Sequence, residues 1–166
     1  MTRLLHLIFL LGCGMSAVHA QSNIELRATV IHGGCAIESS DSHKTVSLGR
    51  WSVRKLQMAG NISMPVAFSL ALKGCPPGSV SVTFSGKAAS NPAWLAIGDS
   101  KMAQQVAIQL RDHDLSPLDL EAPSQAVMVD RNGNSLLHFF ANYVALVNNP
   151  MPGIAKSDAM FTINYY

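Results

Sequence analysis

The chain has 166 residues and a mass of 17.8 kDa, which suits one domain of ordinary size and is too short for two large ones. Twelve Lys and Arg residues against ten Asp and Glu residues leave a net charge of +2, without a run of like charge. This excludes nucleic acid as the main partner, because binding to phosphates needs a concentrated basic patch. The hydrophobic share of 48% is enough for a core, so it also excludes a disordered chain.

Residues 1–20 predict a secretory signal peptide. Arg3 supplies a basic start, residues 4–11 are apolar apart from His6, and small residues occupy the cleavage positions before and at Ala20. The apolar stretch is far shorter than the roughly 20 residues that span a bilayer. We therefore expect cleavage after Ala20 and export from the cytoplasm. A lipoprotein signal ending at Cys13 is the alternative.

Removal of this segment takes Cys13 away and leaves Cys35 and Cys75. A single pair of cysteines in an exported, oxidising setting is most simply a disulfide. Closing a loop of about 40 residues stabilises a domain by roughly 3 to 4 kcal/mol in the chain-entropy description. The spacing matches neither a Cys-x-x-Cys redox motif nor a Cys/His metal site.

After the signal peptide, apolar residues recur mostly at every second position, which is typical of β-strands with one buried face. Asn132-Gly133 predicts a turn, and helices are indicated only weakly, at 54–59 and 102–106. The pattern favours an all-β sandwich of seven or eight short strands. The predicted strands are 24–30, 66–72, 80–86, 106–110, 137–143 and 161–165, with shorter candidates at 45–48 and 126–129.

The first and the last predicted strands along the chain are unusual for an ordinary sandwich. The first, in which Ile24, Leu26, Ala28 and Val30 alternate with polar residues, lies before the first cysteine, and the last runs to Tyr166. Such strands are candidates for the edges of a sheet, where an uncharged strand is a template for pairing with another chain. The first and the last strand therefore both indicate β-strand exchange.

These features together resemble a chaperone-usher pilin, a subunit of bacterial fimbriae, and most of all the minor tip-fibrillum subunits of type 1 fimbriae. Each matching piece is weak alone, but their common order, the cysteine spacing and the penultimate Tyr165 are specific. The matching pieces, in the order of the family, are 24–30 with 34–37, 65–70 leading to Cys75, 80–86, 106–112, 137–143 and 159–165.

The resemblance implies an incomplete immunoglobulin-like β-sandwich, residues 34–166, which a donor strand from a chaperone or a neighbouring subunit completes. Residues 21–33 would be the donor-strand extension, with Ile24, Leu26, Ala28 and Val30 as its inward-facing residues. Cys35 and Cys75 would form the structural disulfide. The last strand would face the chaperone, through Phe161, Ile163, Tyr165 and Tyr166. Basic residues of the chaperone would bind the carboxylate of Tyr166.

The implied function is that of a non-enzymatic structural subunit that is polymerised by donor-strand exchange and supports cell adhesion. Its partners would be a periplasmic pilus chaperone, an outer-membrane usher and neighbouring fimbrial subunits, and its final location would be a fimbrium on the cell surface.

The chain departs from the family pattern at three places. Ala28 replaces a usual Gly, Asn142 replaces a common Arg, and Tyr166 replaces a frequent polar residue.

The residues allow two other functions. Asp112-His113-Asp114 with Ser116 suggests acid-base chemistry, but no Gly-x-Ser-x-Gly motif accompanies it, and we expect a surface patch there. A soluble periplasmic sandwich that binds copper through His and Met is the main alternative, although no His-x-His or Met-x-x-Met cluster supports it.

We expect packing roles for Trp51 and Trp94. We expect no catalytic, cofactor-binding or metal-binding residues and no small-molecule substrate. The histidines concerned are His32, His43, His113 and His138.

Overall fold

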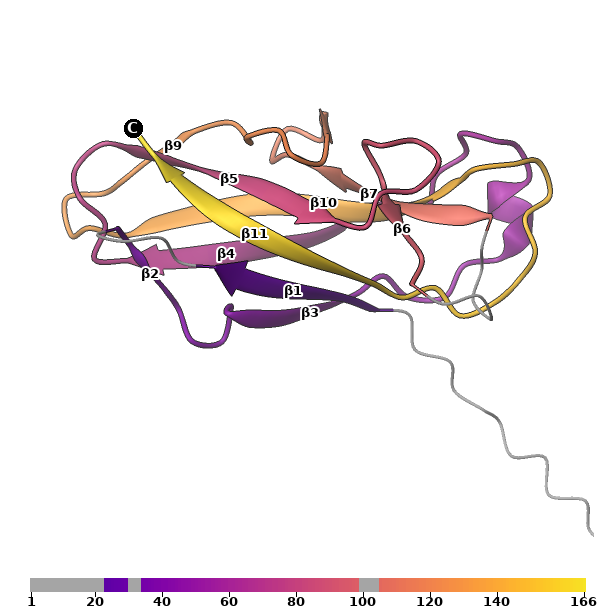
Figure 1. Ribbon diagram of the computed structural model, residues 1–166, viewed down its shortest axis with the longest axis horizontal. Coiled ribbons are helices and arrows are strands. Elements are labelled where there is room, and N and C mark those ends of the chain that lie inside the picture. The colour runs from indigo at the N-terminus through magenta and orange to yellow at the C-terminus, as the bar shows by residue number, and fades with distance from the viewer. Residues whose placement is uncertain (1–22, 30–33, 99–104) are drawn as a thin grey trace, which may run out of the picture.

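Alternating apolar strands form two sheets that face each other across one core (Figure 1). The computed structural model describes residues 23–29, 34–98 and 105–166, apart from the side chains of Ala28 and Thr29. The five-stranded sheet has the order β3 (His43–Ser47), β1 (Asn23–Thr29), β11 (Ser157–Tyr165), β5 (Ser79–Gly86), β9 (Val127–Met128). The other sheet has the order β2 (Ala36–Ile37), β4 (Val66–Lys73), β10 (Ser135–Ala145), β7 (Val106–Arg111), β6 (Leu95–Ala96), and β8 (Pro117–Leu118) also pairs with β7.

The core forms because every second side chain of the long strands points between the sheets. In β10, for example, Leu137, Phe139 and Ala141 are buried while the intervening Leu136 and His138 are exposed. Four phenylalanines meet at the centre, with ring centroids between 5.1 and 6.2 Å apart in the contacting pairs. Their contacts join β4, β5, β10 and β11, so both sheets contribute to one core. These residues are Phe68, Phe84, Phe139 and Phe161.

The six long strands and the two shorter candidates predicted from the alternation are all present, with ends that differ by a few residues. Three strands of two residues each, β2, β6 and β8, were not predicted, because two residues carry no alternation. At Asn132-Gly133 the chain turns as predicted, with Gly133 at a φ of 76° and its N–H donated to Asp130 O at 3.0 Å.

The helix predictions fared less well. The candidate at 54–59 is only a short 3-10 helix, η1 (Val53–Leu56), whose Ser52 side chain accepts a hydrogen bond from Arg54 N. Residues 102–104 of the second candidate lie outside the described residues, and Val106 begins β7 instead. No helix in the described ranges is both long and apolar enough to cross a membrane.

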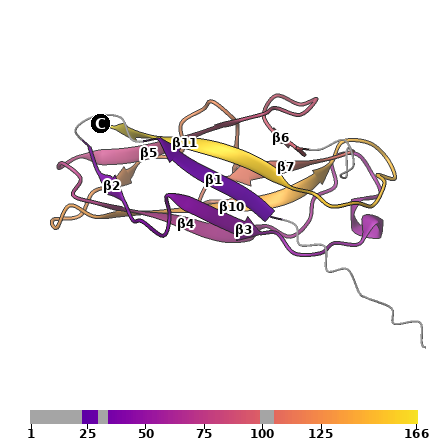
Figure 2. The same ribbon diagram turned by 60° about the horizontal axis from the view of Figure 1, so that its bottom comes forward.

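The strand β1 completes the five-stranded sheet from within the chain. It lies between β3 and β11, which both pair with it (Figure 2). The part of the fold that begins at Gly34 is therefore an immunoglobulin-like sandwich with one strand missing between β3 and β11. The fold agrees with the sequence prediction, and in this structure the missing strand comes from the chain's own N-terminal segment.

Candidate functional site

The gap between β3 and β11 is the candidate functional site, and we call it the strand groove. On one side β1 pairs antiparallel with β3, from Asn23 opposite Ser47 to Arg27 opposite His43. On the other side it pairs parallel with β11, over six residue pairs. The backbone of β1 is thus paired on both of its edges, which is how a central strand of a sheet is held.

Two of the four residues predicted to face inward on a donor strand line this groove within the chain itself. Ile24 and Leu26 have no exposed surface and belong to the core, while Arg27 points outward and forms an ion pair with Glu25 at 3.3 Å. Burial of each of the two apolar side chains is worth about 1.5 to 3 kcal/mol. Ala28 lies opposite Phe161 in the strand register, its side chain is not described, and Val30 falls outside the described residues.

The predicted C-terminal strand forms the other wall of the groove. Phe161 is fully buried with its ring centroid 6.2 Å from that of Phe84, and Ile163 is also buried. Tyr165 is partly buried against the core, whereas the side chain of Tyr166 is exposed. The structure therefore brings the inward-facing residues of β1 and β11 together in one core.

A disulfide between Cys35 and Cys75 lies at the end of the sandwich where β11 finishes. Gly34 precedes it and packs so closely on Tyr165 that an added Cβ would overlap the phenol ring. Burial raises the pKa of the Tyr165 phenol, and a backbone hydrogen bond from Cys35 partly opposes this rise. The disulfide and this contact fasten the chain just after the N-terminal segment. We call this end of the sandwich the Gly34 end.

A partly buried ion pair holds the outer wall of the groove, and the sequence analysis missed it. Asp41 lies just before β3, with its Oδ1 2.7 Å from Lys44 Nζ and its Oδ2 accepting a hydrogen bond from Ala71 N at 2.8 Å. Lys44 also donates to Ser69 O at 2.6 Å. These bonds tie β3 to β4 in the opposite sheet. The only signal in the sequence was an Asp and a Lys three residues apart.

Asn142, one of the three departures from the family pattern, is fully buried in β10. Its Oδ1 accepts a hydrogen bond from Arg111 Nε at 2.8 Å, and Arg111 also donates to Gln109 Oε1 at 2.8 Å. The neutral amides of Asn142 and Gln109 thus accept hydrogen bonds from the guanidinium of Arg111. This cluster lies on the sheet opposite the strand groove.

The residues Asp112, His113 and Asp114 form a turn after β7 and are held by structural hydrogen bonds. Asp112 contacts the imidazole of His113 at 2.9 Å and accepts from Gln125 N at 2.7 Å. Hydrogen bonds from the side chain and backbone of Ser116 lower the pKa of Asp114 to about 2, with a further bond from Gln125. Ser116 therefore donates to a carboxylate, and it is not bonded to His113.

The other residues considered for function are spread over the fold. Trp51 packs partly buried against the core and donates its Nε1–H to Leu48 O at 2.7 Å, while Trp94 lies partly buried near a turn. His32 lies outside the described residues. Within the described ranges, no group of three or more His, Cys, Asp or Glu side chains is placed to hold a metal ion.

The chain is similar in sequence to fimbrial proteins. A family described as "Fimbrial protein" matches residues 24–166. The fimbrial-like protein FimF of Salmonella typhimurium is 52% identical over 143 residues, which cover 86% of this chain and 83% of that protein. The type-1 fimbrial protein A chain of Escherichia coli K12 is 29% identical over 150 residues, covering 86% and 82% of the two chains.

Solved structures with a similar fold include two fimbrial or pilus proteins. The antigen and type I fimbria protein of Burkholderia pseudomallei has a TM-score of 0.64 and 27% identity, with 87% of this chain and 97% of that chain covered. The P pilus rod subunit PapA has a TM-score of 0.67 and 18% identity, with 81% and 100% covered. The second likeness concerns the fold alone.

Proposed function

The chain belongs to the fimbrial protein family, and on this premise we propose that it is a structural subunit of a chaperone-usher fimbria, assembled by donor-strand exchange. In this proposal β1 is the donor strand, and the strand groove of each subunit receives β1 of the next. Residues 21–33 are the extension that is donated, and residues 34–166 are the body that receives. Residues 1–20 are the signal peptide that is removed on export.

One observation carries this proposal. β1 is the sole covering of the gap between β3 and β11 among the described residues, yet it joins the body only through residues 30–33. Without β1, the core around Phe161 would meet water at a cost of about 25 cal/mol per Å² of apolar surface. The backbones of β3 and β11 would also lose their partners, so any strand with the same alternation is stabilised in this groove.

The direction in which a strand enters decides what kind of assembly forms. In this structure β1 is parallel to β11, so its last residue and Gly34 lie at the same end as Tyr165. A neighbour that received β1 in this direction would present its own Gly34 end to the donor, and the exchange would close as a dimer. An antiparallel strand would bring the donor to the opposite end and leave an open filament.

We therefore propose that the chain's own β1 lies parallel to β11 in the free subunit and that a donated β1 lies antiparallel to it in the fimbria. A reversed strand still presents every second side chain to the core, because the alternation has a period of two in either direction. The proposed partners are a periplasmic chaperone, an outer-membrane usher and neighbouring subunits. The proposed destination is the bacterial surface.

A variant of the chain beginning at Gln21 tests the groove. Ile24→Asp with Leu26→Asp should drive the chain's own β1 out, because each change places an unpaired charge in the core. We expect the melting temperature to fall by more than about 10 °C. A wild-type copy of residues 21–33, fused after Tyr166 through a short glycine-containing turn, would enter antiparallel to β11 and should restore the melt.

The matched control carries the same two Asp substitutions in the fused copy and should stay unstable. Circular dichroism melts and size-exclusion chromatography of the three proteins provide the readout. If the double variant melts like the wild type, or if both fused copies restore the melt equally, the groove does not depend on an inserted strand and the proposal is wrong.

A further inference from the structure

The end of the sandwich opposite the Gly34 end carries an apolar surface that the strand groove does not explain. Five large apolar side chains are exposed there. They belong to η1, to the residues just after it and to the connection between β10 and β11, which lie at the same end of the sandwich (Figure 1). Two of them are the most exposed, Met58 at 62% and Met151 at 67%. We call this set the η1-end surface. It consists of Val53, Met58, Val147, Met151 and Ile154.

The members of this surface are held next to one another. Val53 and Met151 line one pocket of about 130 Å³, together with Pro152 and Gly153 of the β10–β11 connection. Asn149 donates its backbone N–H to Gln57 O at 2.8 Å, and the side chain of Asn148 accepts from Ala59 N at 2.9 Å. Two connections far apart in the sequence are therefore fixed against each other and present one apolar surface.

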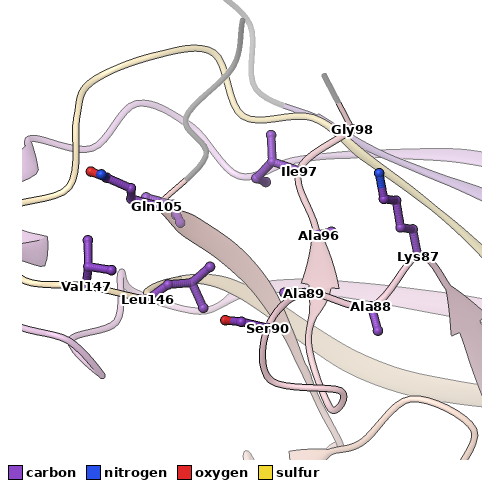
Figure 3. A pocket seen from close by; sticks show the side chains of 11 residues that line it. Lys87, Ala88, Ala89, Ser90, Ala96, Ile97, Gly98, Gln105, Leu146 and Val147 are labelled. Atoms are coloured by element: carbon purple, nitrogen blue, oxygen red, sulfur yellow. The ribbon is translucent and has the colours of Figure 1, made fainter. Parts of the chain in front are cut away.

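Lysine and arginine side chains surround this surface. Arg54 and Lys55 lie on η1, Lys156 follows Ile154 by two residues, and Lys87 shares a pocket of about 530 Å³ with Val147 (Figure 3). None of these four cations forms an ion pair with an acidic residue in the part of the chain that the structure describes. An apolar centre with a charged rim is the usual anatomy of a protein interface.

The short segment between β1 and the body limits which part of a donating subunit can reach this surface. Five Cα–Cα steps separate Thr29 from Gly34, which span at most about 18 Å. The body of a donating subunit therefore lies close to the groove end at which its β1 finishes. For an antiparallel strand this is the end where β11 begins, at Ser157. Ala155, two residues earlier, lines the pocket of Val53 and Met151.

We propose that the η1-end surface is the docking site for the body of the donating fimbrial subunit, which meets it with its Gly34 end. This inference rests on the proposed function and adds a second contact to the exchanged strand. The Gly34 end of this chain offers suitable groups, since Met128 is 73% exposed and Asp130 lies in the turn beside Cys75. Docking selects which subunit fits next and slows the release of its strand.

The test compares two donors on one acceptor, in which Ile24→Asp and Leu26→Asp drive the acceptor's own β1 out of the groove. The donors are a labelled peptide of residues 21–33 and a labelled second copy of the chain from Gln21, and the dissociation rate of each is measured. In the acceptor with Met58→Glu and Met151→Glu, the second copy should dissociate roughly tenfold faster, as for loss of interface hot spots. The peptide has no body, so its rate should not change. Leu136→Glu, at a side chain 48% exposed on β10 in the opposite sheet, is the matched control and should change neither rate.

Circular dichroism melts establish that the variants fold, and Met58→Gln replaces the double variant if the latter melts early. If both donors bind and the second copy leaves the variant at the wild-type rate, docking is overturned while strand exchange stands. If the peptide leaves faster as well, the substitutions act on the groove and docking is likewise overturned. If neither donor binds the acceptor whose own β1 is displaced and whose Met58 and Met151 are intact, the proposed function and the docking site fail together.

Discussion

A few residues outside the alternating apolar pattern fix the walls of the strand groove. Gly34 allows Tyr165 to pack directly on the backbone, and Asp41 with Lys44 holds β3 against the opposite sheet. Removing Lys44 would take one partner from the buried Asp41 carboxylate and so destabilise the fold. The groove thus keeps its width through contacts that lie beside it.

Gly34→Ala should destabilise the protein by about 1 to 3 kcal/mol, because the new methyl group overlaps the ring of Tyr165 and forces a shift. Gly98→Ala is the matched control, since the nearest atom to its added Cβ is Lys156 O at 3.7 Å, an ordinary contact. Urea denaturation of both variants gives the free energies of unfolding. Equal values for the two variants would show that Tyr165 does not pack on Gly34 in solution.

Asp114 should make stability depend on pH in the acid range. Its hydrogen bonds with Ser116 lower its pKa from 3.8 to about 2, so it binds its proton less readily in the folded state. The resulting stabilisation is complete above the unfolded pKa of 3.8 and is lost as the pH falls through about 2.

Asp114→Asn removes this contribution and keeps the size of the side chain. The difference in unfolding free energy between wild type and variant should be constant above about pH 5 and decline between about pH 4 and pH 2. The pKa of Asp130 is also lowered, by hydrogen bonds from Asn134 and Asn132. Because Asp130 is present in both proteins, its contribution to the pH dependence cancels in the difference. A difference that does not change with pH would contradict the hydrogen bonding to Ser116.

At the scale of elements, alternation in the sequence predicted the long strands and the burial of Ile24 and Leu26. It succeeded because a strand with one face in the core repeats every two residues wherever it lies in the sheet. Alternation does not encode partners or direction. The parallel pairing of β1 with β11 within one chain depends on the tertiary fold. The pattern alone therefore predicted a donor strand, but not that this strand lies in the groove of its own chain.

The contacts beside the groove were beyond prediction for a related reason. Asp41 contacts Ala71, and Lys44 contacts Ser69, only because two sheets come together, and no pattern near these residues in the sequence indicates the contacts. Gly34 was noticed as part of a motif, but its contact with Tyr165 joins residues 131 positions apart in the numbering of the chain. Two-residue strands such as β2 are defined by their pairing with a neighbour and have no pattern of their own.

Hydrogen exchange should separate β1 from the rest of the sheet. β1 is joined to the body only by residues 30–33, so it can leave the groove without unfolding β10, which is paired on both sides within the body. We expect amides of β1 to exchange at least about tenfold faster than those of β10, since local opening needs less free energy than global unfolding. Equal protection of the two strands would mean that β1 opens only when the whole domain unfolds.

At the scale of the whole molecule, two strands compete for one groove. The chain's own β1 is tethered, and a short tether gives an effective concentration of the order of millimolar. A free subunit is therefore closed against its neighbours unless a partner keeps the groove occupied or displaces β1. This accounts for a chain that has all its strands and still serves, in our proposal, as one unit of a polymer.

The most direct test is to determine, by electron cryo-microscopy of fimbriae that contain this chain, which strand lies between β3 and β11. Our account predicts a strand from the next subunit, antiparallel to β11, with that subunit's Gly34 end against the η1-end surface. A groove filled in every subunit by the chain's own β1, parallel to β11, would contradict it.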